Sequence, residues 1–156
     1  DVLSSVREIQ LAIEAIITFN MPYLIGAHIS EGVKLPSGEK ISDIIYKIKH
    51  KNLLGLMLSC VSPENYEQNL DEIKNLGVPF GFKLNGFVTT KPKAGYTSTF
   101  NKSKTGNPNE FLGQREDLTP EKMSEFVKTF KEAGATILGG CCETRPTHIM
   151  EMAKLK

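Results

Sequence analysis

Cysteine is the residue type in this chain best suited to chemistry, and its three copies are unevenly spaced. Cys141 and Cys142 are adjacent, within the stretch ATILGGCCETRPTHI at residues 135–149. Cys60 ends the apolar run LLGLMLSC at residues 53–60. Three thiolates with one open position match the donor set of a catalytic zinc site. Whether the three sulfurs can meet depends on the elements that carry them.

The double cysteine lies where a strand gives way to a helix. In a regular strand, adjacent side chains point to opposite faces, so both thiols reach one ion only if the chain leaves strand geometry. Gly139 and Gly140 permit unusual backbone angles and a close approach, and Pro146 indicates that a helix begins soon afterwards. We therefore expect Cys141 and Cys142 on a strand-to-helix turn.

Strands and helices alternate along the chain. Apolar spacing, caps and breakers predict helices over residues 3–19, 42–50, 62–77, 119–134 and 146–155. The same kinds of signal predict strands over residues 21–30, 53–60, 78–85 and 135–140. Strands joined by helices imply right-handed crossovers and a parallel sheet. Because the cysteines end two of these strands, we expect all three at the carboxyl edge, where α/β active sites lie.

Four βα units fit either a small doubly wound sheet or half of an eightfold barrel. No phosphate-cradling glycine motif follows the first strand, which disfavours nucleotide binding. The formal net charge of +1 gives no bias toward nucleic acid. No apolar run approaches the roughly 18 residues that would cross a membrane. The odd number of cysteines argues against a secreted disulfide framework, so we expect a cytoplasmic protein.

The motif GGCC, followed by the polar turn, proline and His-Ile of ETRPTHI, resembles the signature of the homocysteine S-methyltransferase family. LLGLMLSC resembles the sixth strand of that family, FGFKLNG the seventh and ATILGGCC the eighth. The resemblance implies a (β/α)₈ TIM barrel whose catalytic Zn²⁺ is held by Cys60, Cys141 and Cys142. It implies methyl transfer from a small onium donor to the thiolate of homocysteine, which gives methionine.

The same resemblance assigns residues 1–156 to the C-terminal half of the barrel, from about the fourth helix to the eighth. It implies that the N-terminal half acts as a partner, either as a separate chain or as a missing segment. Asn85 is expected to contact substrate or a group around the metal, with capping of the strand-to-loop turn as the alternative. Gly139 and Gly140 are expected to let backbone approach the substrate.

The chain departs from the family pattern at two positions beside the cysteines. Ser59 stands where the family often has Asn, and Glu143 stands where it often has Gly. We expect the Glu143 carboxylate to face away from the thiolates, to meet a cation, or to attract a positively charged methyl donor. Of the nearby histidines, His28 is expected to be a hydrogen-bonded core or rim residue and His148 to pack a helix turn.

A long basic loop over residues 86–118 is predicted to be mobile and to act as a lid. Two readings compete with the enzyme. One is a non-catalytic α/β domain that binds zinc or thiols. The other is a small α/β scaffold with incidental buried cysteines. Zinc content separates the last reading from the first two, and methyl transfer to homocysteine separates enzyme from binding domain.

Overall fold

The computed structural model describes residues 2–44, 50–91 and 109–155. Four strands form one parallel sheet in the order β1-β2-β3-β4. The elements are, in chain order, α1 (Val6–Ile17), β1 (Tyr23–Ala27), the 3₁₀ helix η1 (Ile41–Ile44), β2 (Leu53–Val61), α3 (Pro63–Lys74), β3 (Phe80–Leu84), the 3₁₀ helix η2 (Glu110–Leu112), α4 (Pro120–Glu132), β4 (Ile137–Gly140) and α5 (Pro146–Ala153). The parallel α/β sheet predicted from the sequence is therefore confirmed. Of the predicted helix over 42–50, only η1 is described, since residues 45–49 lie outside the described residues.

Helix starts follow local capping chemistry. The Ser62 hydroxyl accepts a hydrogen bond from the backbone N–H of Asn65, and Thr119 does the same for Lys122. A proline is the first helical residue in both α3 and α4. Each helix thus starts one residue after its polar cap, at a fixed place relative to the strand before it.

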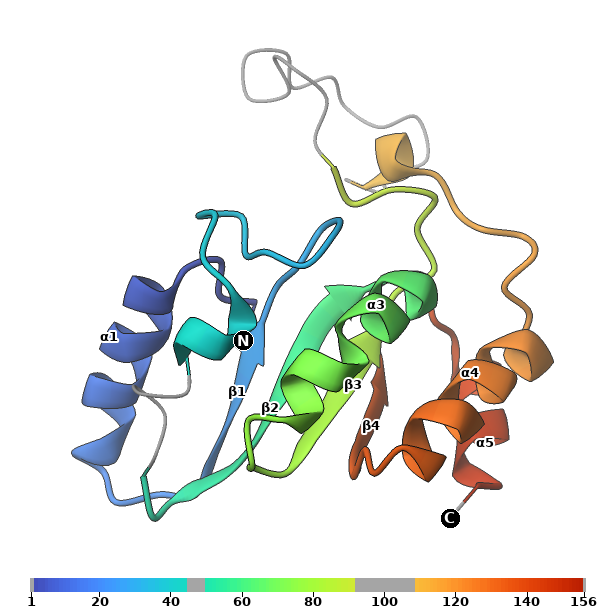
Figure 1. Cartoon of the computed structure of the whole chain (residues 1–156). Coiled ribbons are helices and arrows are strands. Elements are labelled where there is room, and N and C mark those ends of the chain that lie inside the picture. The colour runs from blue at the N-terminus through green and yellow to red at the C-terminus, as the bar shows by residue number, and fades with distance from the viewer. Residues whose placement is uncertain (1, 45–49, 92–108, 156) are drawn as a thin grey trace.

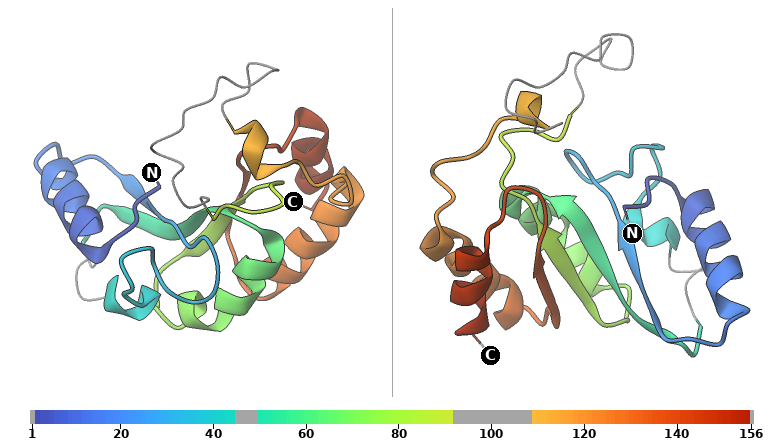
Figure 2. Two further views of the ribbon diagram at one scale, coloured as in Figure 1. Left: turned by 90° about the horizontal axis from the view of Figure 1, so that it is seen from above. Right: turned by 180° about the vertical axis from the view of Figure 1, so that it is seen from behind.

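Helices cover one face of the sheet and its two flanks, while no described helix covers the other face (Figures 1 and 2). Seen from above, the strands form an arc, with the helices on its convex side (Figure 2). We call the opposite side the concave face. Among the described residues, no helix has the length and apolarity needed to span a bilayer.

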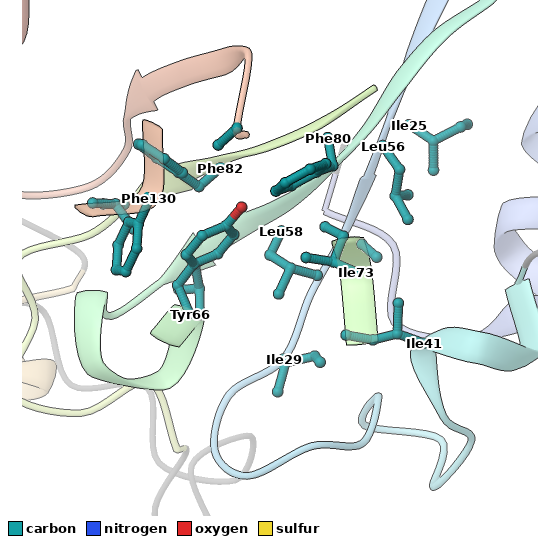
Figure 3. Close-up of a cluster of buried hydrophobic side chains, with 14 of the residues drawn as sticks. Ile25, Ile29, Ile41, Leu56, Leu58, Tyr66, Ile73, Phe80, Phe82 and Phe130 are labelled. Atoms are coloured by element: carbon teal, nitrogen blue, oxygen red, sulfur yellow. The ribbon is translucent and has the colours of Figure 1, made fainter. Parts of the chain in front are cut away.

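The core lies between the convex face and its helices. Tyr66 of α3, Phe82 of β3 and Phe130 of α4 are fully buried and pack ring against ring, with centroids 4.7–5.6 Å apart (Figure 3). Such aromatic pairs each contribute about 1 kcal/mol beyond their burial. This cluster fixes α3 and α4 against the sheet, and so fixes the strand ends from which the cysteines project.

Candidate metal centre

The structure brings the three thiols together. The Cys60 sulfur lies 3.8 Å from the Cys142 sulfur, which lies 3.9 Å from the Cys141 sulfur. All three sulfurs lie within 4.8 Å of one another, and each cysteine is free and half-buried. The separations are far beyond the 2.03–2.05 Å of a disulfide bond. The cysteines therefore form an open thiol cluster from residues 82 positions apart in the chain.

A bulge near the end of β2 aims Cys60 at this cluster. Cys60 has a φ of 58°, in the left-handed region that non-glycine residues seldom adopt. The pairing with β3 shifts register here: Ser59 faces Lys83 and Val61 faces Leu84, so Cys60 is the extra residue. The strand predicted to end at Cys60 runs on to Val61. Bulges of this kind re-aim a side chain at a sheet edge.

A tight turn presents the other two thiols. The Cys141 N–H donates to the Leu84 carbonyl at 2.7 Å, which carries the sheet ladder one residue beyond β4. The chain then reverses, because the backbone N–H and the hydroxyl of Thr144 both donate to the Cys141 carbonyl. The Gly86 N–H donates to the Cys142 carbonyl at 2.9 Å and joins the turn to the end of β3.

The glycines before the cysteines play different parts from those expected. Neither Gly139 nor Gly140 has a positive φ; the left-handed residue of the turn is Glu143, with a φ of 60°. A Cβ on Gly140 would lie 2.3 Å from the Thr144 hydroxyl oxygen, so the turn closes only on a glycine. Gly140 is therefore required by the turn itself, and the expected approach of backbone to substrate at Gly139 and Gly140 stays a prediction.

Asn85 lies beside the cluster and is fully buried. Its side-chain oxygen accepts a hydrogen bond from the Phe87 N–H at 3.1 Å, which caps the turn after β3. Its amide nitrogen lies 3.8 Å from the Cys60 sulfur, within reach of a weak N–H···S hydrogen bond. Asn85 thus caps the turn and contacts one of the thiols, while its expected contact with substrate stays a prediction.

The three thiols do not hold their protons equally. A hydrogen bond from Cys60 and one from the Cys142 backbone lower the pKa of Cys141 to about 5, and the positive charge of Lys83 acts in the same direction. The hydrogen bond with Cys141, together with burial, raises the pKa of Cys60. Burial and the neighbouring Cys141 charge raise the pKa of Cys142. The cluster therefore already favours a thiolate at Cys141.

The cluster also has the dimensions of a metal site. A tetrahedral ion with metal–sulfur bonds of about 2.3 Å separates its sulfur ligands by about 3.8 Å. The separations of the Cys142 sulfur from the Cys60 and Cys141 sulfurs, 3.8 and 3.9 Å, match that spacing. Three sulfur donors select soft or borderline ions over magnesium or calcium. Cys60, Cys141 and Cys142 are thus able to hold one such ion and leave a coordination position open.

The two histidines near the cluster face other partners. His28 donates from Nδ1 to the Ser59 carbonyl, and its Nε2 lies 2.8 Å from the Ser30 hydroxyl. His148 is buried; its Nδ1 accepts from the Arg145 N–H and its Nε2 donates to the Leu118 carbonyl at 3.0 Å. Both therefore act in the structure as hydrogen-bonded packing residues, as expected.

The loop over 86–118 is tied down at its base. Phe87 and Gln114 pair in an antiparallel bridge, so the two ends of the loop run side by side. Arg115 then donates to Glu64 of α3 at 2.8 Å and to both oxygens of Asp117. The predicted lid falls on residues 92–108, which lie outside the described residues.

A cavity of about 240 Å³ lies at the carboxyl edge of the sheet and is lined in part by Asn85. It lies between the segment after β1, the start of α3 and the segment after β3, and its lining includes Glu31, Glu64, Asn85 and Phe87. Asn85 is the link between the cavity and the thiols, because it lines the cavity and its amide nitrogen lies 3.8 Å from the Cys60 sulfur. No sequence signal identified this cavity, because its walls come from three separate βα units.

Comparison with known proteins identifies the relatives of this chain. A sequence profile described as "Homocysteine S-methyltransferase" matches residues 1–155. The chain is 29% identical over 138 residues to Homocysteine S-methyltransferase 1 of Saccharomyces cerevisiae. It is 25% identical over 125 residues to Homocysteine S-methyltransferase 1 of Arabidopsis thaliana. The aligned parts cover 85% and 80% of this chain but only 38% and 34% of those relatives.

Solved structures with a similar fold also match nearly all of this chain but less than half of their own length. The apo form of the homocysteine methyltransferase MmuM from Escherichia coli matches with a TM-score of 0.71 at 16% identity. That match covers 100% of this chain and 48% of MmuM. A metallated form of MmuM matches with a TM-score of 0.65 at 17% identity and covers 99% of this chain. The chain therefore spans about half of a barrel enzyme, which confirms the predicted half-barrel.

Proposed function

Because the chain belongs to the homocysteine S-methyltransferase family, we propose that it is the zinc-binding half of an enzyme that methylates homocysteine. The observation that carries this proposal is the meeting of three thiol sulfurs, within 4.8 Å of one another, at the carboxyl edge of a parallel sheet. Active sites of barrels lie at this edge, and three thiols suit zinc with one open position. Free thiols also suit a reducing compartment, and we propose the cytoplasm.

In this proposal, Cys60, Cys141 and Cys142 hold Zn²⁺ as thiolates. When bound, zinc supplies the positive charge that keeps an incoming homocysteine sulfur deprotonated and nucleophilic at neutral pH. The methyl group of a sulfonium or ammonium donor passes to that sulfur: a new S–CH₃ bond forms, and the donor keeps the electron pair of the bond that breaks. The products are methionine and the demethylated donor.

The chain's own residues would shape the centre. The Asn85 amide holds the Cys60 sulfur from the side of the cavity, so it orients that thiolate. The close turn at Gly140 keeps Cys141 and Cys142 on one side, and Gly139 leaves the sheet below them without a side chain. The cavity beside Asn85 offers room for part of a small substrate. The Glu143 carboxylate, next to Cys142, is proposed to favour a cationic donor.

The missing strands would complete the site. β1 and β4 are the edges of the sheet, and no helix among the described residues covers the concave face. Leu3 already makes a parallel bridge to Ala27 on the outer edge of β1, at the place of a preceding strand. We propose that residues 1–156 correspond to the fourth through eighth helices, and that an N-terminal half with four further strands completes the barrel and binds the amino-acid part of homocysteine.

The test is methyl transfer with the barrel restored. The 156-residue chain is combined with an N-terminal half carrying the first four βα units, and methionine is measured after incubation with homocysteine and S-methylmethionine or betaine. We expect methionine formation that Cys60→Ser abolishes, while Lys131→Ser, an exposed change on α4, leaves it intact. Equal activity of Cys60→Ser and parent would contradict the proposal. If the chain binds one zinc ion but no onium donor yields methionine, the result would favour a non-catalytic zinc-binding domain.

A further inference from the structure

Lys83 is the charged residue of β3, and its side chain lies on the face of the sheet opposite to the apolar side chains of that strand. In β3, Phe80 and Phe82 point into the core beneath the helices (Figure 3), and Leu84 belongs to the same buried cluster. Side chains alternate along a strand, so Lys83 points to the concave face. It is half-buried there, in the middle of the sheet, paired with Ser59 on one side and Gly139 on the other.

Gly139 makes room for this lysine. A Cβ on Gly139 would lie 3.6 Å from the Lys83 Cγ, so the aliphatic stem of the lysine crosses the surface left open by the glycine. On the same face, the next positions toward the carboxyl edge are Asn85, directly after β3, and Cys141, directly after β4. The two segments are joined by the hydrogen bond from the Cys141 N–H to the Leu84 carbonyl. Lys83 therefore lies one step below the thiol cluster.

Charge gives this placement a consequence. Three thiolates around a divalent ion leave the centre with a net charge of −1, and partial burial makes an uncompensated charge costly. The Lys83 ammonium adds the missing unit of positive charge from inside the sheet. The sheet register supports this role, because Lys83 pairs with Gly139, two residues before Cys141.

We propose that Lys83 is a positioning residue that compensates the negative charge of the thiolate centre and so strengthens metal binding. It acts through the three sulfurs and does not touch the metal or the substrate. The inference rests on the proposed metal site but goes beyond it, since any three-thiol site would bind zinc without a lysine below it.

The test is a charge series at position 83, in the full 156-residue chain, with zinc affinity measured by competition against a chromophoric chelator at constant pH and low salt. Lys83→Arg keeps the charge, Lys83→Gln removes it and Lys83→Glu reverses it. We expect Arg to bind zinc as the parent does, Gln about tenfold more weakly and Glu about a hundredfold more weakly. Lys74→Gln, a matched change in the last turn of α3, should leave the affinity unchanged.

Two further comparisons separate an effect on zinc affinity from an effect on folding. Circular dichroism separates loss of affinity from loss of fold, and Lys83→Arg against Lys83→Gln decides the matter if Lys83→Glu fails to fold. Equal affinities of the Arg and Gln variants would overturn the role of Lys83 while leaving the zinc site intact. A parent chain that binds no zinc would instead overturn the proposed function itself.

Discussion

At the scale of single residues, two non-glycine residues at the thiol cluster have left-handed backbone: Cys60 itself, and Glu143 next to Cys142. Cys60 has a φ of 58° and Glu143 a φ of 60°. Left-handed backbone costs a residue with a Cβ about 1–2 kcal/mol, and such strain concentrates at functional sites. At Cys60 the strain aims a sulfur into the cluster. At Glu143 it closes the turn that carries the other two sulfurs.

Glu143→Gly tests the strain in that turn. We expect its free energy of unfolding to exceed that of Glu143→Ala by about 1 kcal/mol, since only glycine adopts this φ without penalty. Urea denaturation of both variants measures the difference, and the alanine variant serves as the control for loss of the carboxylate. If the alanine variant proves as stable as the glycine variant, position 143 is not strained.

A second residue-scale prediction concerns Tyr66. Its ring is fully buried, and its hydroxyl has no hydrogen-bond partner among the described residues. An unpaired buried hydroxyl destabilises a fold by about 1 kcal/mol or more. Tyr66→Phe keeps the ring contacts with Phe82 and Phe130, so we expect it to raise the unfolding free energy by about 1 kcal/mol. Tyr66→Leu, which loses those ring contacts, should lower it; a less stable Tyr66→Phe would reveal a partner for the hydroxyl.

At the scale of elements, the contact of Arg115 with Glu64 joins the base of the long loop to the start of α3. Burial of the Glu64 carboxyl raises its pKa, but the hydrogen bond and charge of Arg115 outweigh this and lower the pKa overall. A carboxyl whose pKa is lower in the folded state stabilises the fold above its unfolded pKa. That stabilisation is lost as the pH falls through the folded pKa.

The pH dependence of Glu64→Gln checks this contact. We expect the parent to be more stable than the variant at pH 7, by less than about 1 kcal/mol because the pair is partly exposed. The difference should shrink as the pH falls below about 4, where the carboxyl takes up its proton. Glu67→Gln, on the exposed side of α3, is the matched control. A parent–variant difference that stays constant down to pH 3 would contradict the ionic contribution.

Local signals explain why the elements were predictable from sequence. Ser62 and Thr119, each followed by proline, fix the starts of α3 and α4, and the predicted limits differ from the observed ones by only a few residues. Strand ends also located the cysteines at one edge of the sheet. The bulge at Cys60 and the left-handed Glu143 were not predictable, because they depend on pairing with β3 and on the packing of Gly86 against the turn.

At the scale of the whole molecule, half a barrel leaves apolar surface without a cover. Leu24 of β1 is 42% exposed, and in the described part of the chain the outer edges of β1 and β4 pair with no further strand, apart from the single bridge of Leu3 to Ala27. Exposed strand edges and apolar faces favour association. We therefore predict that the isolated 17.3 kDa chain self-associates, and that an N-terminal half converts it to a one-to-one complex.

Light scattering coupled to size exclusion measures this directly. The mass of the isolated chain should exceed 17.3 kDa and rise with concentration. Adding the N-terminal half should give a single species with the summed mass. A chain that stays monomeric and soluble at high concentration, and that does not bind the N-terminal half, would contradict a split or incomplete barrel.

The central claim is that three thiols from distant parts of the chain hold one zinc ion, and metal content of the purified chain tests it most directly. Elemental analysis, with zinc supplied during expression and excess removed, should give one zinc per chain. Cys60→Ser, Cys141→Ser and Cys142→Ser should each reduce that content to a small fraction, while Ser59→Ala, beside Cys60, should retain it. Zinc that is absent from the folded parent, or that persists unchanged in Cys60→Ser, would contradict the account.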